Sequence, residues 1–411
     1  MLLYENKKIK LLNYLKIGLN PFKNFVSTGE IEEKVGVVSS RKDTLQSIVK
    51  LTENHKQNFI LPIIASVGVG KTHLFWSIKK KLYYYNTVYI SLENVYRKFY
   101  YNIYSEFLEE MGVKVLRSIT NELCNKWGAQ EKKFGFFHVA DIEKVKEHGY
   151  SNLNNNFENN DVLKEVISVI VTHQLDPYKK IEAENWLLGE LMDYKNLSRL
   201  NLSNDLKKNQ YAFTLLKIII ENSKLGSVLY IDDFERLIGL MKSFDDEVES
   251  DENNIYSSSW LYGNDESPPE KIKAQKILDK ILKLLHINGL KVIITLKSEE
   301  SLDDIKKIIQ EKNPDLLSSF IEPITINNFN EYDLFQFYRK NMKSYLEKIH
   351  FLEFLEDNPK ELFPLNEKIL SNIYMATKGN PREIIKNLIK IFNLIIYSDE
   401  DLNEILNNFY V

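Results

Sequence analysis

The sequence predicts an α/β fold, in which a parallel β-sheet is joined to a long helical insertion and to an all-helical C-terminal domain. Two observations predict the sheet: short apolar runs alternate with stretches of helical periodicity, and a glycine-rich segment directly follows the first run. Strands that alternate with helices pair in parallel and are covered by helices on both faces. A third observation predicts the added parts, because residues 112–216 and 327–411 show helical periodicity almost throughout.

The N-terminal segment, residues 1–50, should hold two helices. The first ends where Gly18 and Pro21 interrupt the periodicity, and the second follows Ser39-Ser40. Residues 51–111 and 217–326 should form the sheet-containing core. Its expected strands are the apolar runs at 59–64, 87–96, 226–234, 289–298 and 324–326.

The two remaining parts are predicted to be helical. Residues 112–216 form an insertion without strand alternation, which is interrupted at 151–161 and at Asp176-Pro177. Residues 327–411 form a separate helical domain. Within the core, the acidic stretch at 245–270, rich in Asn and Ser, is predicted to be a solvated loop.

Composition excludes several classes of protein. The 411 residues are 44% hydrophobic and 27% charged, which is typical of globular chains long enough for two or three domains. A net charge of −4 argues against a surface that coats nucleic acid throughout, although a local basic face remains compatible with it. The single cysteine, Cys124, excludes an internal disulfide and a cysteine-clustered zinc site. No apolar run approaches the ~20 residues that span a bilayer, and charged residues interrupt the N-terminus. We therefore expect a cytoplasmic protein with no membrane partner.

The segment that follows the first strand fits the pattern of a phosphate-binding loop, with alanine in place of the first glycine. Its members are Ala65, Ser66, Val67, Gly68, Val69, Gly70, Lys71 and Thr72. The glycines let successive N–H groups curl around phosphates, and the helix that begins near Lys71 adds its positive end. Lys71 should reach the β- and γ-phosphates, and the Thr72 hydroxyl should bind Mg²⁺. ATP and Mg²⁺ are thus the expected cofactors, and His73 either lines the nucleotide pocket or packs within the helix.

The apolar strand expected at 228–233 ends in two carboxylates, Asp232 and Asp233. In phosphate-loop hydrolases such a strand end holds Mg²⁺ through water, and the next acidic residue positions the attacking water. Asp232 is therefore the predicted metal residue and Asp233 the predicted water-positioning residue. Glutamate is commoner at the second position, and a carboxylate that falls roughly 1–1.5 Å short can lower the rate about 10²-fold. If the extended backbone continued, Glu235 would point to the same side as Asp233 and could share or take over this role.

Three further segments make the chain resemble AAA+ ATPases, a P-loop NTPase family, of the origin-recognition and initiator branch. The chain also resembles related ATPases of prokaryotic mobile elements and defence systems. Asn20-Pro21-Phe22, followed by Ser40-Arg41, is similar to the adenine-pocket segment of that branch. Thr295 stands at the strand end where the family places its sensor 1, and Gly379-Asn380-Pro381-Arg382 is similar to its sensor 2 motif. The resemblance implies that Mg-ATP lies between the core and a helical lid, with Arg41 near adenine and Thr295 and Arg382 reading the γ-phosphate.

A narrower resemblance is to the ATP-binding proteins of BREX phage-defence systems. It rests on NWLLGEL at 185–191, followed by the acidic strand 226–234. Two departures from the AAA+ pattern bear on activity. Ser318-Ser319 stand where many family members place an arginine finger, a residue worth about 10³–10⁵ in turnover. Initiators also continue into a winged-helix DNA-binding domain, whereas this sequence stops about thirty residues after Arg382.

The expected function is that of a Mg-dependent ATPase acting as a nucleotide-driven switch on DNA or on a DNA-processing or defence complex. A protein partner or a second copy of the chain is also expected. A first alternative is a signalling or scaffold module that binds ATP with negligible hydrolysis, which Asp233 and the missing arginine favour. A second alternative is a DNA-processing protein that binds DNA through the insertion at 112–216. Salt-dependent DNA binding that responds to ATP would distinguish it.

Overall fold

The computed structural model describes residues 2–23, 37–55, 57–92, 98–133, 136–139, 141–242, 269–356 and 358–409. The predicted acidic loop at 245–270 lies outside these ranges up to residue 268. Its last two residues begin helix α13 (Pro269–Leu285).

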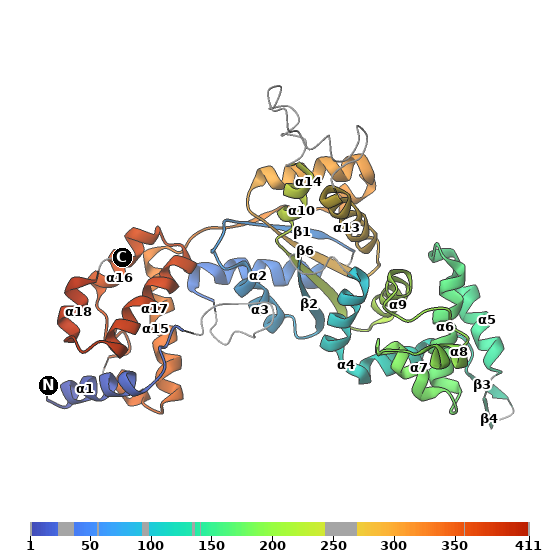
Figure 1. Ribbon diagram of the computed structural model, residues 1–411, viewed down its shortest axis with the longest axis horizontal. Helices are drawn as coiled ribbons and strands as arrows, with labels where there is room; N and C mark the ends of the chain where they lie inside the picture. The colour runs from blue at the N-terminus through green and yellow to red at the C-terminus, as the bar shows by residue number, and fades with distance from the viewer. Residues whose placement is uncertain are drawn as a thin grey trace, which may run out of the picture.

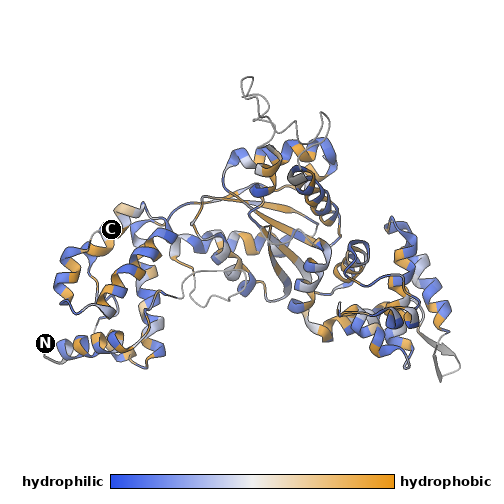
Figure 2. Ribbon diagram, in the orientation of Figure 1, coloured by the Kyte–Doolittle hydropathy of each residue, from blue (hydrophilic) through white to orange (hydrophobic). Residues whose placement is uncertain are grey.

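A five-stranded parallel sheet forms the centre of the molecule, which confirms the predicted α/β class. Its strand order is β2-β5-β6-β1-β7. The strands are β1 (Ile60–Ala65), β2 (Tyr85–Ser91), β5 (Gly226–Asp232), β6 (Leu290–Leu296) and β7 (Ile324–Ile326). Every residue of β1 and β6 is buried because both strands lie inside the sheet; β1 is apolar throughout, and β6 is apolar except for Lys291 and Thr295. Figure 2 shows this concentration of hydrophobic residues in the central strands.

Helices cover both faces of the sheet (Figure 1). On one face lie α2 (Ser39–Asn54) and α3 (Lys71–Lys81), and on the other lie α10 (Glu235–Lys242), α13 and α14 (Glu299–Lys312). Helix α3 leads from β1 toward β2, whereas α14 leads from β6 toward β7, in the opposite direction along the sheet. Right-handed crossovers place two such helices on opposite faces. The neighbouring carboxyl ends of β1 and β6 therefore form a switch point, the place where open α/β sheets bind ligands.

The insertion is mostly helical, and it also contains a short β-hairpin. Its helices are α4 (Phe99–Lys126), α5 (Ile142–Leu153), α6 (Asn160–Leu175), α7 (Lys180–Leu187), α8 (Tyr194–Leu200) and α9 (Asn209–Asn222), with a 3₁₀ turn at Asn154–Asn156. Strands β3 (Gln130–Lys133) and β4 (Phe136–Val139) pair antiparallel, so the expectation of no strand within 112–216 is wrong. Helix α4 packs on β2 and continues into the insertion through a kink at Gly112, whose φ is 76°. The insertion shares one hydrophobic cluster with the α10, α13 and α14 face of the sheet.

The C-terminal domain is a second helical body with its own core. It contains α15 (Glu331–Lys348), α16 (Glu367–Thr377), α17 (Pro381–Tyr397) and α18 (Leu402–Asn408), with 3₁₀ turns at Pro314–Ser319, before it, and at Leu352–Leu355. Helix α1 (Leu2–Ile17) packs here, because Leu11, Leu15 and Phe22 join its hydrophobic cluster, whereas α2 belongs to the sheet. The first fifty residues are thus shared between the two bodies. In the described ranges, no helix combines the length and apolarity that crossing a bilayer requires.

Candidate functional site

The glycine loop (residues 65–72) leaves the carboxyl end of β1 and leads into α3. Gly68 has φ 84° and Gly70 has φ 103°, a left-handed backbone that L side chains rarely adopt. Val69 is buried among the residues of α2 and α3, whereas Ser66 and Val67 are exposed. The buried valine anchors the loop while its tip faces outward.

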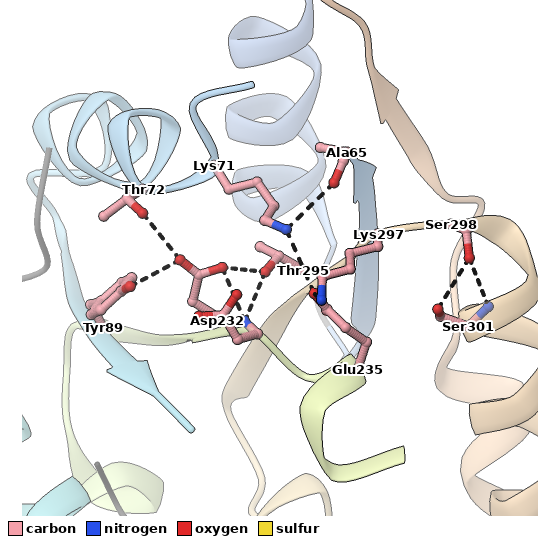
Figure 3. Close-up of polar contacts among 11 residues, drawn as sticks. Ala65, Lys71, Thr72, Tyr89, Asp232, Glu235, Thr295, Lys297, Ser298 and Ser301 are labelled. Atoms are coloured by element: carbon pink, nitrogen blue, oxygen red, sulfur yellow. Dashed lines mark hydrogen bonds and ion pairs between the residues drawn. The ribbon is translucent and has the colours of Figure 1, made fainter. Parts of the chain in front are cut away.

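Lys71 lies between the loop and a buried carboxylate. Its Nζ donates a hydrogen bond to the carbonyl of Ala65 at 3.4 Å and lies 3.9 Å from Oε1 of Glu235 (Figure 3). Lys297, just beyond β6, places its Nζ 3.6 Å from the same oxygen. The Glu235 side chain is only 7% exposed, yet neither of its oxygens has a hydrogen-bond partner in the described part of the chain. A buried carboxylate without hydrogen bonds is costly, so both oxygens of Glu235 would accept hydrogen bonds from a molecule bound beside Lys71.

The Asp232 carboxylate is the hub of the site. Oδ1 accepts from the Thr295 hydroxyl and from the backbone N–H of Asp233 at 3.1 Å. Oδ2 accepts from the Thr72 hydroxyl at 3.2 Å and from the Tyr89 hydroxyl at 2.9 Å. Asp232 is 3% exposed and Thr295 is fully buried. The predicted residues Lys71, Thr72, Asp232, Glu235 and Thr295 are therefore gathered at the carboxyl ends of β1, β5 and β6.

Two tyrosines that sequence reasoning missed complete this hub. Tyr89 on β2 donates to Asp232, and Tyr230 on β5 donates to the carbonyl of Lys71 at 2.9 Å. Burial raises the pKa of both hydroxyls, and the nearby Asp232 carboxylate raises the pKa of Tyr89 further. The available signal was weak: Tyr230 lies within the apolar run of β5, whereas Tyr89 lies in β2, which contains a second tyrosine and several polar residues. Lys297 was also missed, although it lies two residues after Thr295.

Glu235 reaches the site by a different route from the one expected. The extended backbone ends at Asp232, because Asp233 has a left-handed φ of 58° and α10 begins at Glu235. The prediction that an extended backbone would place Glu235 on the same strand face as Asp233 is therefore wrong. The first turn of α10 nevertheless brings the Glu235 carboxylate toward Lys71. The backbone N–H of Asp233 also donates to Thr295 Oγ1 at 3.2 Å, which ties this turn to β6.

The start of α17 contacts the glycine loop directly. The Asn380 side chain donates to the carbonyl of Val67 at 2.9 Å, and the Arg382 backbone N–H donates to the carbonyl of Gly68 at 3.1 Å. Asn380 Oδ1 also caps α17 by accepting from the N–H groups of Arg382 and Glu383. A Cβ at Gly68 would lie 2.7 Å from Asn380 Oδ1 and 2.9 Å from Arg382 Cβ. Gly68 thus allows the C-terminal domain to approach, and it leaves the Arg382 side chain exposed above the loop.

Arg41 and His73 lie at the margin of this cluster. The Arg41 guanidinium donates to the carbonyl of Asn327 and, at 3.5 Å, to that of Val69, so it joins the loop to the segment between the two bodies. Burial lowers the pKa of Arg41 to about 10, although Asp333 acts in the opposite direction. His73 is half-buried in the first turn of α3. Asn20 lies on the C-terminal domain, where it donates to the carbonyl of Ile389 at 3.0 Å.

The donor set suits a hard divalent cation. Thr72 Oγ1 and Asp232 Oδ2 lie 3.2 Å apart and supply oxygen only. Among the described residues, no group of three or more His, Cys, Asp or Glu side chains gathers as a metal cage. Mg²⁺ typically binds one or two protein oxygens and takes its other ligands from water and phosphate. The two residues therefore fit Mg²⁺ bound together with a phosphate ligand.

In comparisons with known proteins, no family model matched the chain and no curated protein matched its sequence.

Proposed function

We propose that the chain is a Mg-dependent ATPase of the AAA+ type, in which the C-terminal domain acts as a lid and the nucleotide state switches a partner. The observation that carries the proposal is the Glu235 carboxylate. It is buried without hydrogen bonds beside Lys71, in the crevice that also holds Thr72 and Asp232. A lysine that follows a glycine loop, a hydroxyl beside a buried aspartate and a second carboxylate are the parts that phosphoryl transfer to water requires.

The residues of the glycine loop would bind the phosphates. Within the described residues, the Lys71 ammonium contacts only a carbonyl at 3.4 Å and a carboxylate at 3.9 Å, so a phosphate oxygen offers it a stronger partner. Thr72 and Asp232 would hold the cation, which when bound neutralises charge on the phosphate oxygens. Thr295, whose hydroxyl is tied to Asp232, would fix the carboxylate relative to β6.

Glu235 is the carboxylate that we assign to orienting the attacking water, in preference to Asp233. It is buried, it approaches Lys71, and both of its oxygens are available to accept hydrogen bonds. Lys71 Nζ and Lys297 Nζ lie 3.9 Å and 3.6 Å from its Oε1, so two cationic groups hold the carboxylate beside the glycine loop. Asp233 contributes its backbone N–H to the hub, and its side chain is less buried than that of Glu235.

The test compares two isosteric variants in steady-state ATP hydrolysis and in ATP binding. Glu235→Gln should retain ATP binding and lose turnover by about 10²–10⁴-fold, because an amide cannot accept the proton. Asp233→Asn should keep turnover within a few-fold, since asparagine tolerates the left-handed backbone. Lys71→Ala should abolish binding, and Lys81→Ala, at the far end of α3, serves as its matched control.

The outcomes separate the assignments. If Glu235→Gln and Asp233→Asn lost turnover equally, both carboxylates would share the water-positioning role. If only Asp233→Asn lost turnover, the role would belong to Asp233. Absence of ATP binding by the unaltered protein, with and without Mg²⁺, would contradict the proposed function itself.

A specific observation favours the second candidate, a nucleotide-gated module with negligible turnover. Arg339 on α15 is a candidate to supply the missing arginine, but its Nε donates to the carbonyl of Lys360 at 3.2 Å within the C-terminal domain. A catalytic arginine would then have to come from a partner protein or a second copy of the chain. Tight ATP binding, with turnover that stays at the level of Lys71→Ala, would identify this candidate.

A further inference from the structure

We propose that Tyr89 is a positioning residue that sets the affinity of the site for its divalent cation by holding the Asp232 carboxylate in one orientation. The inference rests on the proposed function, because it concerns the cation that accompanies the nucleotide. It is carried by the hydrogen bond from the Tyr89 hydroxyl to Asp232 Oδ2, 2.9 Å long (Figure 3).

Tyr89 reaches Asp232 diagonally across two strands. In the β2–β5 register, Tyr89 stands opposite Tyr230 and Ser91 stands opposite Asp232. Long side chains span such diagonals of a sheet. The tyrosine hydroxyl therefore arrives from the edge strand, on the side of Asp232 away from β6.

Ring packing fixes where this hydroxyl lies. The Tyr89 ring stacks against Tyr230 with centroids 6.0 Å apart at 20°, and it contacts Phe75 of α3 with centroids 5.0 Å apart. These contacts hold the phenol independently of its hydrogen bond.

Four donors fill the Asp232 carboxylate, which offers about four lone-pair positions. Thr295 and the N–H of Asp233 occupy Oδ1, and Tyr89 and Thr72 occupy Oδ2. Of these donors, only Thr72 is also expected to bind the cation. Tyr89 therefore fills one position on Oδ2 and leaves the other directed at Thr72, so the carboxylate presents a single oriented oxygen to the cation and its water.

Removal of this hydroxyl should weaken cation binding without altering the phosphate-binding loop. Loss of an outer-shell partner of a metal ligand typically lowers metal affinity about 10–100-fold. In Tyr89→Phe, three donors remain on Asp232 and the ring packing persists. We expect the Mg²⁺ concentration at half-maximal enhancement of nucleotide binding to rise about tenfold or more. Nucleotide affinity measured in EDTA should stay unchanged.

The experiment follows the anisotropy of a fluorescent ATP analogue bound to the full chain while MgCl₂ is titrated into EDTA-treated protein. Tyr85→Phe is the matched control, because it removes a hydroxyl from the same strand that donates to the carbonyl of Thr52, away from Asp232. Its Mg²⁺ midpoint should equal that of the unaltered protein. Circular dichroism checks that both variants are folded.

Three outcomes would overturn the inference. An unchanged Mg²⁺ midpoint in Tyr89→Phe would show that the hydroxyl does not act on the cation. An equal loss of affinity in EDTA would show a packing role only, and an unfolded Tyr89→Phe would show that the hydroxyl serves folding. If the unaltered protein binds the analogue regardless of Mg²⁺, this inference fails while nucleotide binding stands. If it binds none, the proposed function fails first.

Discussion

Asp233 shows how one strained residue organises the site. A left-handed backbone costs a residue with a Cβ about 1–2 kcal/mol, somewhat less for aspartate. In return, its N–H reaches both Asp232 Oδ1 and Thr295 Oγ1, and the turn starts α10 with Glu235 facing Lys71. Strain of this kind persists where the surrounding structure demands it, often at functional sites.

Substitutions at Asp233 should therefore separate backbone strain from side-chain chemistry. Asp233→Ala should be less stable than Asp233→Gly by about 1 kcal/mol, because only glycine adopts this conformation without strain. Urea unfolding followed by circular dichroism measures the difference. Equal stabilities would mean that the turn relaxes when the aspartate is replaced.

At the residue scale, the sequence predicted those site residues whose spacing is set by the chemistry of phosphate binding. Lys71, Thr72 and Asp232 follow from a loop pattern and from an apolar strand that ends in a carboxylate. Tyr89 and Lys297 did not follow, because their contacts depend on strand order and register. A tyrosine in a β-strand is compatible with simple packing, and the pairing of β2 with β5 is what brings Tyr89 to Asp232.

At the scale of elements, the first turn of α17 combines helix capping with docking on the glycine loop. Asn380 uses its Oδ1 to cap the helix and its Nδ2 to hold the carbonyl of Val67. The apolar face of α17 meanwhile packs in the C-terminal core through Ile384, Leu388 and Ile391. A movement of the loop is thereby connected to a rigid helix.

Two substitutions at Asn380 separate these contributions. Asn380→Ser keeps a capping oxygen and loses the amide that binds Val67, whereas Asn380→Ala loses both. The free energy of unfolding should therefore fall by about 1 kcal/mol more in the alanine variant than in the serine variant. Denaturant titration provides the measurement, and equal values would show that the cap adds nothing to α17.

Helices and strands were predictable where the sequence carries a clear apolar run or a strong helix-start signal, and unpredictable where it carries neither. The apolar strands β1, β5 and β6 carry clear runs, and the asparagine–proline start of α17 is a strong helix signal. The hairpin had no such signal. Strand β3 consists of four polar residues, QEKK, and it becomes a strand only by pairing with β4.

At the scale of the whole molecule, close contact between the glycine loop and the C-terminal domain depends on Gly68. Gly68→Ala should separate the two bodies, because the new Cβ would overlap Asn380 and Arg382. Gly70→Ala is the matched control, since it has a comparable left-handed φ of 103° and its Cβ would meet only His73 Cβ, at 3.9 Å. Small-angle X-ray scattering should show a larger radius of gyration for the first variant alone. The same increase in both would attribute the change to loop strain.

The path of the chain between the two bodies has a geometric consequence. Val37 and Val38 join the two bodies, because Val37 packs in the cluster of the sheet and Val38 in that of the C-terminal body. The chain crosses to the C-terminal body again after Ile326. These crossings are held side by side, since the N–H groups of Ser39 and Ser40 bond to Gln336 and Asp333 of α15. Two adjacent connections form a hinge, which favours rotation of the C-terminal body about one axis relative to the sheet. Helices α1 and α18 both belong to the C-terminal body (Figure 1). Dyes at the two chain ends would therefore keep a constant separation during this rotation. To report the rotation, one dye must lie on the C-terminal body and the other on the insertion.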